Sequence, residues 1–176
     1  MIKKLCILVF VAALFSCTQQ KEAEANTELL YFDIQGYFAK EGLRMQKLNP
    51  TFVKTVNVNG NIESKKIKIA DWEKEFTIFT NADINKNSWK GSFQVNKQNG
   101  EEVYTSDSKK IPVKKLTVLR KDSTVRMIQI VINNKNILFQ SNDTLTYYPD
   151  SLYAIKKKQK IRILNEKNYQ VIGKLK

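Results

Sequence analysis

The residue types that usually carry enzyme chemistry are sparse in this chain. Histidine is absent, which removes the usual near-neutral acid and base and the commonest transition-metal ligand. The two cysteines and six glycines form no Cys–His pair and no glycine-rich phosphate loop. Carboxylate pairs such as Glu73/Glu75 and Glu101/Glu102 lie one or two residues apart and diverge. We therefore expect no catalytic residue, metal site or cofactor; an enzyme with unrecognised carboxylates is the alternative.

Cations are the chemical groups that stand out, and they concentrate in the second half of the chain. Residues 17–108 carry 12 Lys/Arg and 13 Asp/Glu, a net charge of −1, whereas residues 109–176 carry 16 Lys/Arg and 4 Asp/Glu, a net charge of +12. Strand alternation places four of these cations on one basic face: Lys156, Lys158, Lys160 and Arg162. Such a face could bind lipid phosphates, acidic glycans or an acidic protein. The alternative is a solvated, lysine-rich sheet surface.

The N-terminal residues have the pattern of an export signal. Two lysines precede an apolar run at 5–14, which is too short for an ordinary transmembrane helix. The run ends at Leu14-Phe15-Ser16-Cys17, which resembles the lipobox of bacterial lipoproteins. The resemblance implies that residues 1–16 are a signal peptide and that Cys17 carries the acyl chains, such as palmitate, that anchor the protein. The alternative is a secreted soluble protein in which Cys17 is incidental.

The residues after Cys17 predict a tether followed by one domain. Residues 18–26 are polar and lack aromatic side chains, so 17–26 is expected to be an acylated cysteine with a flexible linker. The stretch 20–24 partly resembles the acidic export tag of Bacteroidota lipoproteins, although a generic linker explains it equally well. Residues 27–176 contain no cysteine and are long enough for a single α+β domain held by its core.

Apolar spacing predicts two helices and a long series of strands. Apolar residues recur every three or four positions over 27–49, and again from Asp71 to about 82–85. Asn59-Gly60 separates strands at 52–58 and 62–69, a strong signal for a hairpin. Further strands are expected at 90–96, 101–106, 113–120, 124–132, 136–140, 144–148, 151–156, 160–164 and 169–174. Their short connections favour antiparallel neighbours.

We predict an α+β fold: helix, β-hairpin and helix, then a long curved antiparallel meander that is half-barrel-like. Several strands are apolar on both sides, and two helices can cover mainly one face of a sheet. The other face is then expected to form an open groove for a fatty acid or lipid. The expected lining residues are Ile128, Ile130, Leu138 and Tyr147.

A third pattern consists of Asp, then Ser or Thr, then a small or aliphatic residue. It places hydroxyl groups at Ser123, Thr144 and Ser151. The pattern resembles the acceptor site for O-glycosylation in exported Bacteroidota proteins. Tight turns favour the same residue types, and all three positions are predicted at turns, so both interpretations stay open.

Three segments carry a wider resemblance: 32–38 (FDIQGYF), 71–75 (DWEKE) and 145–149 (LTYYP). Together with the lipobox, they resemble uncharacterised outer-membrane lipoproteins of the Bacteroidota. The resemblance implies a lipid-anchored envelope protein, periplasmic or surface-exposed, with a possible protein partner and no nucleic acid. In architecture alone, the chain is also similar to half-barrel lipoproteins that shelter acyl chains. We expect a non-catalytic binding or accessory role with an apolar ligand; docking on envelope polyanions through the basic face is the alternative.

Overall fold

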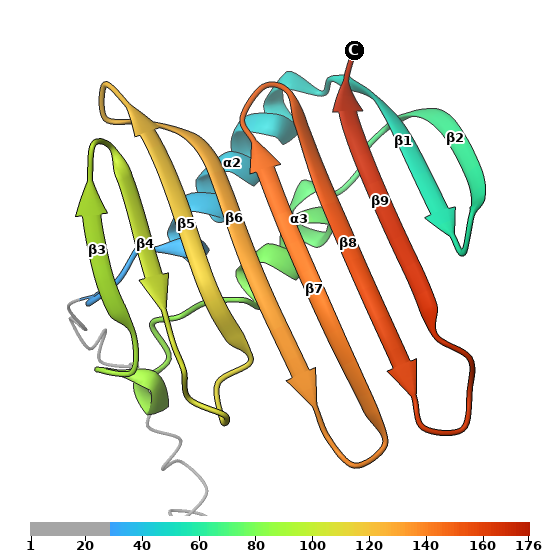
Figure 1. Cartoon of the computed structure of the whole chain (residues 1–176). Coiled ribbons are helices and arrows are strands. Elements are labelled where there is room, and N and C mark those ends of the chain that lie inside the picture. Colours follow the sequence, from blue (N-terminus) through green and yellow to red (C-terminus); the bar gives the residue numbers. More distant parts are fainter. Residues whose placement is uncertain (1–28) are drawn as a thin grey trace, which may run out of the picture.

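The computed structural model describes residues 29–176, which form one antiparallel sheet with helices on one of its faces (Figure 1). The helices are α2 (Ile34–Leu48) and α3 (Trp72–Thr80), followed by the short 3-10 helix η2 (Asn87–Trp89). The strands are β1 (Thr51–Val58), β2 (Asn61–Lys68), β3 (Gln94–Gln98), β4 (Glu101–Thr105), β5 (Val113–Lys121), β6 (Thr124–Lys135), β7 (Phe139–Tyr148), β8 (Leu152–Ile161) and β9 (Lys167–Leu175). Their order across the sheet is β2-β1-β9-β8-β7-β6-β5-β4-β3. The predicted α+β class with an antiparallel meander is confirmed, and the sheet does not close into a barrel.

The helix boundaries follow from their caps. The helix predicted at 27–49 begins only at Ile34, because the Asp33 side chain accepts a hydrogen bond from the Gly36 N–H at 2.7 Å and so caps the first turn. It ends where Asn49 adopts a left-handed conformation. Helix α3 begins as predicted, with Asp71 as its cap, and ends at Thr80, before the predicted 82–85.

The hairpin turns are formed by residues that tolerate positive φ. Asn59 has φ 51° and Gly60 has φ 95°, so the predicted β1–β2 hairpin is confirmed. The same arrangement recurs at Asn99-Gly100, between β3 and β4.

The structure has two long strands where the polar residues of the sequence predicted breaks and four shorter strands. The predicted strands at 136–140 and 144–148 merge into β7, and those at 151–156 and 160–164 merge into β8. Residues 141–143 were predicted to interrupt the strand, but their pairing with both neighbouring strands is continuous. Asn142, for example, pairs with Asn133 on β6 and with Lys158 on β8. Polar side chains are accommodated there because half of them point away from the helices.

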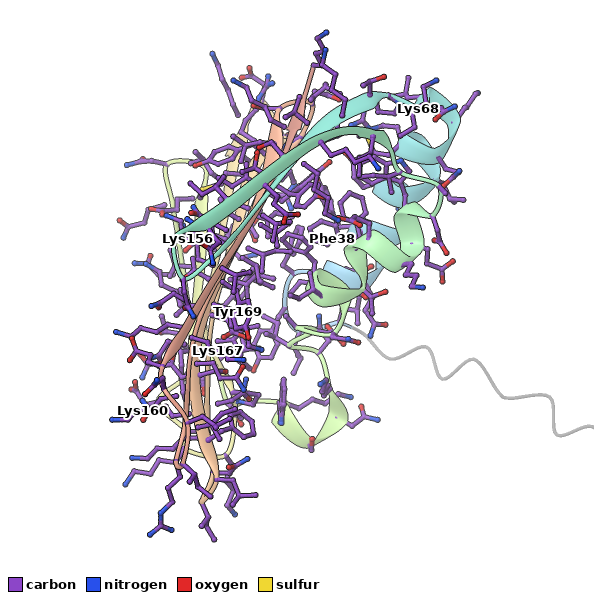
Figure 2. All side chains as sticks on the ribbon, turned by 90° about the vertical axis from the view of Figure 1, so that its right-hand side faces the viewer. Phe38, Lys68, Lys156, Lys160, Lys167 and Tyr169 are labelled. Atoms are coloured by element: carbon purple, nitrogen blue, oxygen red, sulfur yellow. The ribbon has the colours of Figure 1, made fainter. Side chains whose placement is uncertain are left out.

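Aromatic side chains fill the space between the helices and the sheet. Phe38 of α2 and Phe76 and Phe79 of α3 surround the Tyr147 ring, with centroid separations of 5.3, 5.4 and 6.2 Å. Figure 2 views the sheet edge-on and shows Phe38 in this layer, whereas Lys156 and Lys160 lie on the side away from the helices. We call these two sides the covered face and the open face.

Candidate functional site

The four residues predicted to line a lipid groove do not form one, and this prediction is wrong. Ile128, Ile130 and Tyr147 lie on the covered face and are 0%, 0% and 3% exposed beneath the two helices. Leu138 lies instead in the turn between β6 and β7 and is 67% exposed. The covered face is closed core because the aromatic side chains of α2 and α3 occupy the space that a ligand would need.

The covered face also contains carboxylates, and the first of them is Glu41 of α2. It is 8% exposed, accepts a hydrogen bond from the Tyr147 hydroxyl, and lies 2.6 Å from an Arg44 guanidinium nitrogen. Arg44 also contacts Asp150 at 2.7 Å, in the turn between β7 and β8. Burial raises the pKa of Tyr147, and the hydrogen bond to Glu41 raises it further, so the hydroxyl stays protonated. This network ties α2 to the sheet.

An equivalent arrangement ties α3 to the sheet. Glu75 accepts a hydrogen bond from the hydroxyl of Tyr153 on β8 and lies 2.7 Å from the ammonium group of Lys54 on β1. Tyr153 itself fits against β9 because Gly173 has no side chain; a Cβ there would lie 2.2 Å from its ring. The pKa of Tyr153 is raised, first by burial and then by Glu75.

The third glutamate of the covered face is Glu102 on β4, which is half-buried, as Glu75 is. Burial by itself would raise its pKa, but hydrogen bonds from Tyr104, Arg120 and Lys97 outweigh burial and lower the pKa to about 2. Arg120 and Lys97 lie 2.6 and 3.1 Å from its oxygens. All three carboxylates are thus engaged by a tyrosine and a cation, which is what a structural ion pair in a partly buried site requires. Residues 29–176 contain no cluster of His, Cys, Asp or Glu that could hold a metal ion.

The open face carries a different set of side chains, arranged as a polar grid. One row across the strands contains Asn57, Gln170, Lys156 and Thr144, and the next contains Asn168, Lys158 and Asn142. Neighbouring members of a row lie about 5 Å apart, and the two rows about 7 Å apart, as sheet geometry dictates. No element of residues 29–176 covers this grid.

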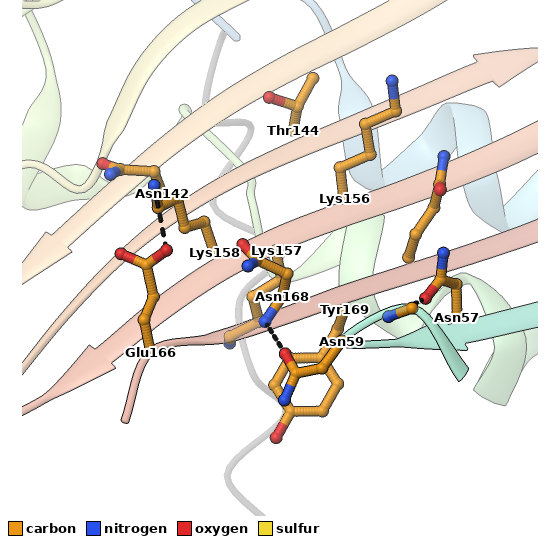
Figure 3. Close-up of a pocket in the computed structure, with 12 residues that line it drawn as sticks. Asn57, Asn59, Asn142, Thr144, Lys156, Lys157, Lys158, Glu166, Asn168 and Tyr169 are labelled. Carbon is orange, nitrogen blue, oxygen red and sulfur yellow. Dashed lines mark hydrogen bonds and ion pairs between the residues drawn. The ribbon is translucent and has the colours of Figure 1, made fainter. Parts of the chain in front are cut away.

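These rows line a hollow of about 650 Å³ on the open face. The tip of the β1–β2 hairpin forms one wall, where the Asn168 N–H donates to the Asn59 side-chain oxygen at 2.8 Å (Figure 3). Lys158 pairs with Glu166 at 3.1 Å. The side chains of Lys156, Asn142, Asn168 and Gln170 make no hydrogen bond or ion pair within the described part of the chain.

The structure divides the predicted basic face into two parts. Lys156, Lys158 and Lys160 are exposed on the open face of β8, but only Lys156 and Lys158 line the hollow. Lys160 pairs with Gln140 nearer the end of the sheet, and Arg162 follows β8 in the turn to β9. The intervening Lys157 points to the covered face, where its ammonium group lies 3.4 Å from Asp143.

Sequence reasoning missed the amide side chains of the hollow. The sequence pattern that indicates them is a polar residue at every second position. These positions are Gln140, Asn142, Thr144 and Thr146 in β7, and Asn168 and Gln170 in β9. This alternation identifies a solvent-facing side of a strand, but it does not show that the two strands lie on either side of β8.

Of the three hydroxyl groups proposed for glycosylation, two lie at turns and one lies within a strand. Ser123 and Ser151 are exposed at the β5–β6 and β7–β8 turns, as predicted. Thr144 is not at a turn: it lies within β7, half-buried on the open face, between Val131 and Lys156. The Asp143-Thr144 pair looked like a turn because the sequence does not show that Asp143 contacts Lys157 across the ladder.

A second hollow, of about 660 Å³, lies between α2 and α3. Phe38, Gly42 and Phe76 line it, together with polar residues from both helices, and Leu43 at its edge is 75% exposed. Its lining residues belong to the two helices and their ends, so it lies on the opposite side of the sheet from the polar hollow.

Cys17 and the segments predicted as signal peptide and tether lie outside residues 29–176. Among the described residues, no helix has the length and apolar character needed to cross a membrane. Comparison with protein-family models, curated proteins and solved structures finds no match to this chain.

Proposed function

We propose that the chain is a non-catalytic envelope lipoprotein that binds an acidic polysaccharide on the open face of its sheet. The observation that carries the proposal is the hollow in which Lys156 and Lys158 lie beside three amide side chains that make no hydrogen bond within residues 29–176: Asn142, Asn168 and Gln170. Ammonium groups favour carboxylate, sulfate or phosphate groups, and amides both donate to and accept from sugar hydroxyls.

The shape of the hollow favours an extended polymer over a small molecule. It crosses four neighbouring strands, β1, β9, β8 and β7, and is open to solvent along the sheet. A small ligand is normally bound in an enclosed and mostly apolar pocket. A chain molecule can instead gain affinity from repeated weak contacts along a row of similar side chains.

The envelope location in this proposal rests on the lipobox at Leu14-Phe15-Ser16-Cys17. Mass spectrometry of native material should show acyl groups on residue 17, and the Cys17→Ala variant should lack them. Detection of unmodified Cys17 in native protein would refute the lipid anchor without affecting the binding proposal.

The binding proposal is tested with polygalacturonate, an acidic sugar polymer, and with dextran as a neutral polymer of matched length. We expect binding to polygalacturonate that weakens with added salt, and no comparable binding to dextran. Lys156→Gln/Lys158→Gln should weaken binding about ten-fold. Asn142→Ala/Asn168→Ala should weaken it less, because neutral hydrogen bonds are weaker than charge-assisted ones.

The matched control is Lys40→Gln/Lys74→Gln, which removes the same charge from exposed positions on the two helices. If this control weakens binding as much as Lys156→Gln/Lys158→Gln does, the interaction depends on net charge and the hollow is not its site. Equal binding to dextran would exclude an acidic ligand.

A further inference from the structure

Two neighbouring turns at one end of the sheet expose aliphatic side chains. Ile137 and Leu138, between β6 and β7, are 82% and 67% exposed; Ile163 and Leu164, between β8 and β9, are 90% and 58% exposed. Ile163 and Ile137 are the two most exposed large hydrophobic residues of the described chain. Large apolar side chains that are more than half exposed and clustered indicate a surface that contacts another phase or molecule.

The two turns lie side by side and are held in place by hydrogen bonds. The Arg162 N–H donates to the Leu138 carbonyl at 2.9 Å, which joins one turn to the other. The Asn136 side-chain oxygen accepts from the Leu138 and Phe139 N–H groups, each at 2.8 Å. In Figure 1 both turns are at the lower end of the sheet. The aliphatic side chains therefore project from an ordered edge, which we call the apolar tips.

Turn formation does not account for the aliphatic residues. At the opposite end of the sheet, the β5–β6 and β7–β8 turns use Asp122-Ser123 and Asp150-Ser151, the polar residues that solvent-exposed turns favour. Asn136 alone already supplies the hydrogen bonds that close the β6–β7 turn. The apolar tips thus add exposed hydrophobic area with no benefit to local structure.

Cations surround the apolar tips. Lys135 at the end of β6, Lys160, Arg162 and Lys167 at the start of β9 are all exposed, and none is ion-paired within residues 29–176. Glu166 is the acidic residue of the two turns, and Lys158 neutralises it at 3.1 Å. Both features are complementary to an anionic bilayer. Its interface accepts the projecting aliphatic groups, and its negatively charged surface attracts the unpaired cations around them.

We propose that the β6–β7 and β8–β9 turns form a membrane-docking edge, which inserts Ile137, Leu138, Ile163 and Leu164 into the interface of an anionic bilayer. A protein partner would need a cavity to receive the projecting tips, whereas a bilayer accepts them anywhere on its surface. The docking edge adjoins the polar hollow at Glu166, which lines the hollow, but none of its four aliphatic side chains does. It does not require that Cys17 be acylated.

The test measures the depth of a single fluorescent label in vesicles of equal parts phosphatidylglycerol and phosphatidylethanolamine. The full chain carries Cys6→Ala and Cys17→Ala, so that a cysteine introduced by Asn165→Cys, in the β8–β9 turn, accepts an environment-sensitive dye. We expect a blue shift and quenching by spin-labelled lipid. The same dye at Ser151→Cys, at the opposite end of the sheet, should show neither effect.

A second variant isolates the aliphatic groups. Ile137→Ser/Leu138→Ser/Ile163→Ser/Leu164→Ser should abolish the quenching at position 165 and leave the fold intact, because all four side chains are exposed. The matched control Leu43→Ser/Leu48→Ser/Ile62→Ser/Val95→Ser removes exposed aliphatic groups elsewhere and should leave the quenching unchanged.

Three results would overturn the proposal. The first is vesicle-bound protein with no quenching at position 165, and the second is equal quenching at positions 165 and 151, which indicates non-specific adsorption. The third is a blue shift at position 165 that grows with protein concentration in the absence of lipid, because it would assign the apolar tips to contact between copies of this chain.

Discussion

The glutamates of the covered face and the polar side chains of the hollow on the open face differ in their partners. On the covered face, Glu41, Glu75 and Glu102 each receive a tyrosine hydroxyl and a cation within the protein. On the open face, Lys156 and the amides beside it make no such contact in residues 29–176. The same strands contribute to both faces, because successive side chains point to opposite sides.

The difference separates side chains that stabilise the fold from side chains that the fold does not require. A carboxylate in a buried or half-buried place is costly without a partner, so the contacts of Glu41, Glu75 and Glu102 contribute to stability. An exposed lysine or amide satisfies its hydrogen bonds with water and can exchange them for a ligand at little cost. The contacts of the covered face therefore stabilise the fold, and the open face is where we propose that a ligand binds.

The largest expected effect comes from placing one charge on each face. Ile130→Glu introduces a carboxylate at a position that is 0% exposed, and should destabilise the domain by about 4 kcal/mol or prevent folding. Val131→Glu, one residue along β6, points to the open face near Lys115 and should cost less than about 1 kcal/mol. Urea unfolding measures both. A similar loss of unfolding free energy in the two variants would show that the two faces do not differ in environment.

A smaller difference is expected when existing ion pairs are broken. Glu75→Ala leaves the Tyr153 hydroxyl and the Lys54 ammonium group without their partner, which should cost about 2–3 kcal/mol. Lys158→Ala breaks the exposed pair with Glu166 and should cost about 0.5 kcal/mol or less. Thermal unfolding of the two variants tests this order, and a larger loss from Lys158→Ala would reverse our assignment of the faces.

Acid should weaken the covered face through Glu102. Its pKa in the folded protein is about 2, below the ordinary value of 4.5, so the folded state binds the proton less readily than the unfolded state does. The stabilisation from Glu102 is complete above pH 4.5 and is lost as the pH falls through 2. Unfolding free energies of the wild type and Glu102→Gln should converge over this range; a constant gap between them would contradict the assignment.

The smallest effect on stability is expected from modification of surface hydroxyls. Ser123 and Ser151 are exposed at turns, whereas Thr144 is half-buried within β7, so a modifying enzyme can reach the two serines more easily. Peptide mapping of native protein should find added mass at Ser123 or Ser151 and none at Thr144. Unmodified peptides at all three positions would favour the interpretation that Ser123 and Ser151 serve turn chemistry alone.

The features that could be predicted from the sequence depend on residues close together in the chain. The left-handed turn at Asn59-Gly60 and the cap at Asp71 use short-range backbone preferences, and both are present. Strand alternation likewise placed Lys156, Lys158 and Lys160 on one side of β8. Where polar residues belonged to a long strand, as at Asn142, the same preferences wrongly predicted a turn.

Local pattern alone determined that residues 29–176 form two α-helices and an antiparallel meander, because capping, turn and alternation signals act over a few residues. Only the tertiary structure decided which side of each strand the helices cover, and so placed Ile128, Ile130 and Tyr147 in closed core while leaving Leu138 exposed. The pairing of Tyr147 with Glu41 joins positions 106 residues apart. Such contacts follow from how the helices pack on the sheet, which no spacing within a single segment encodes.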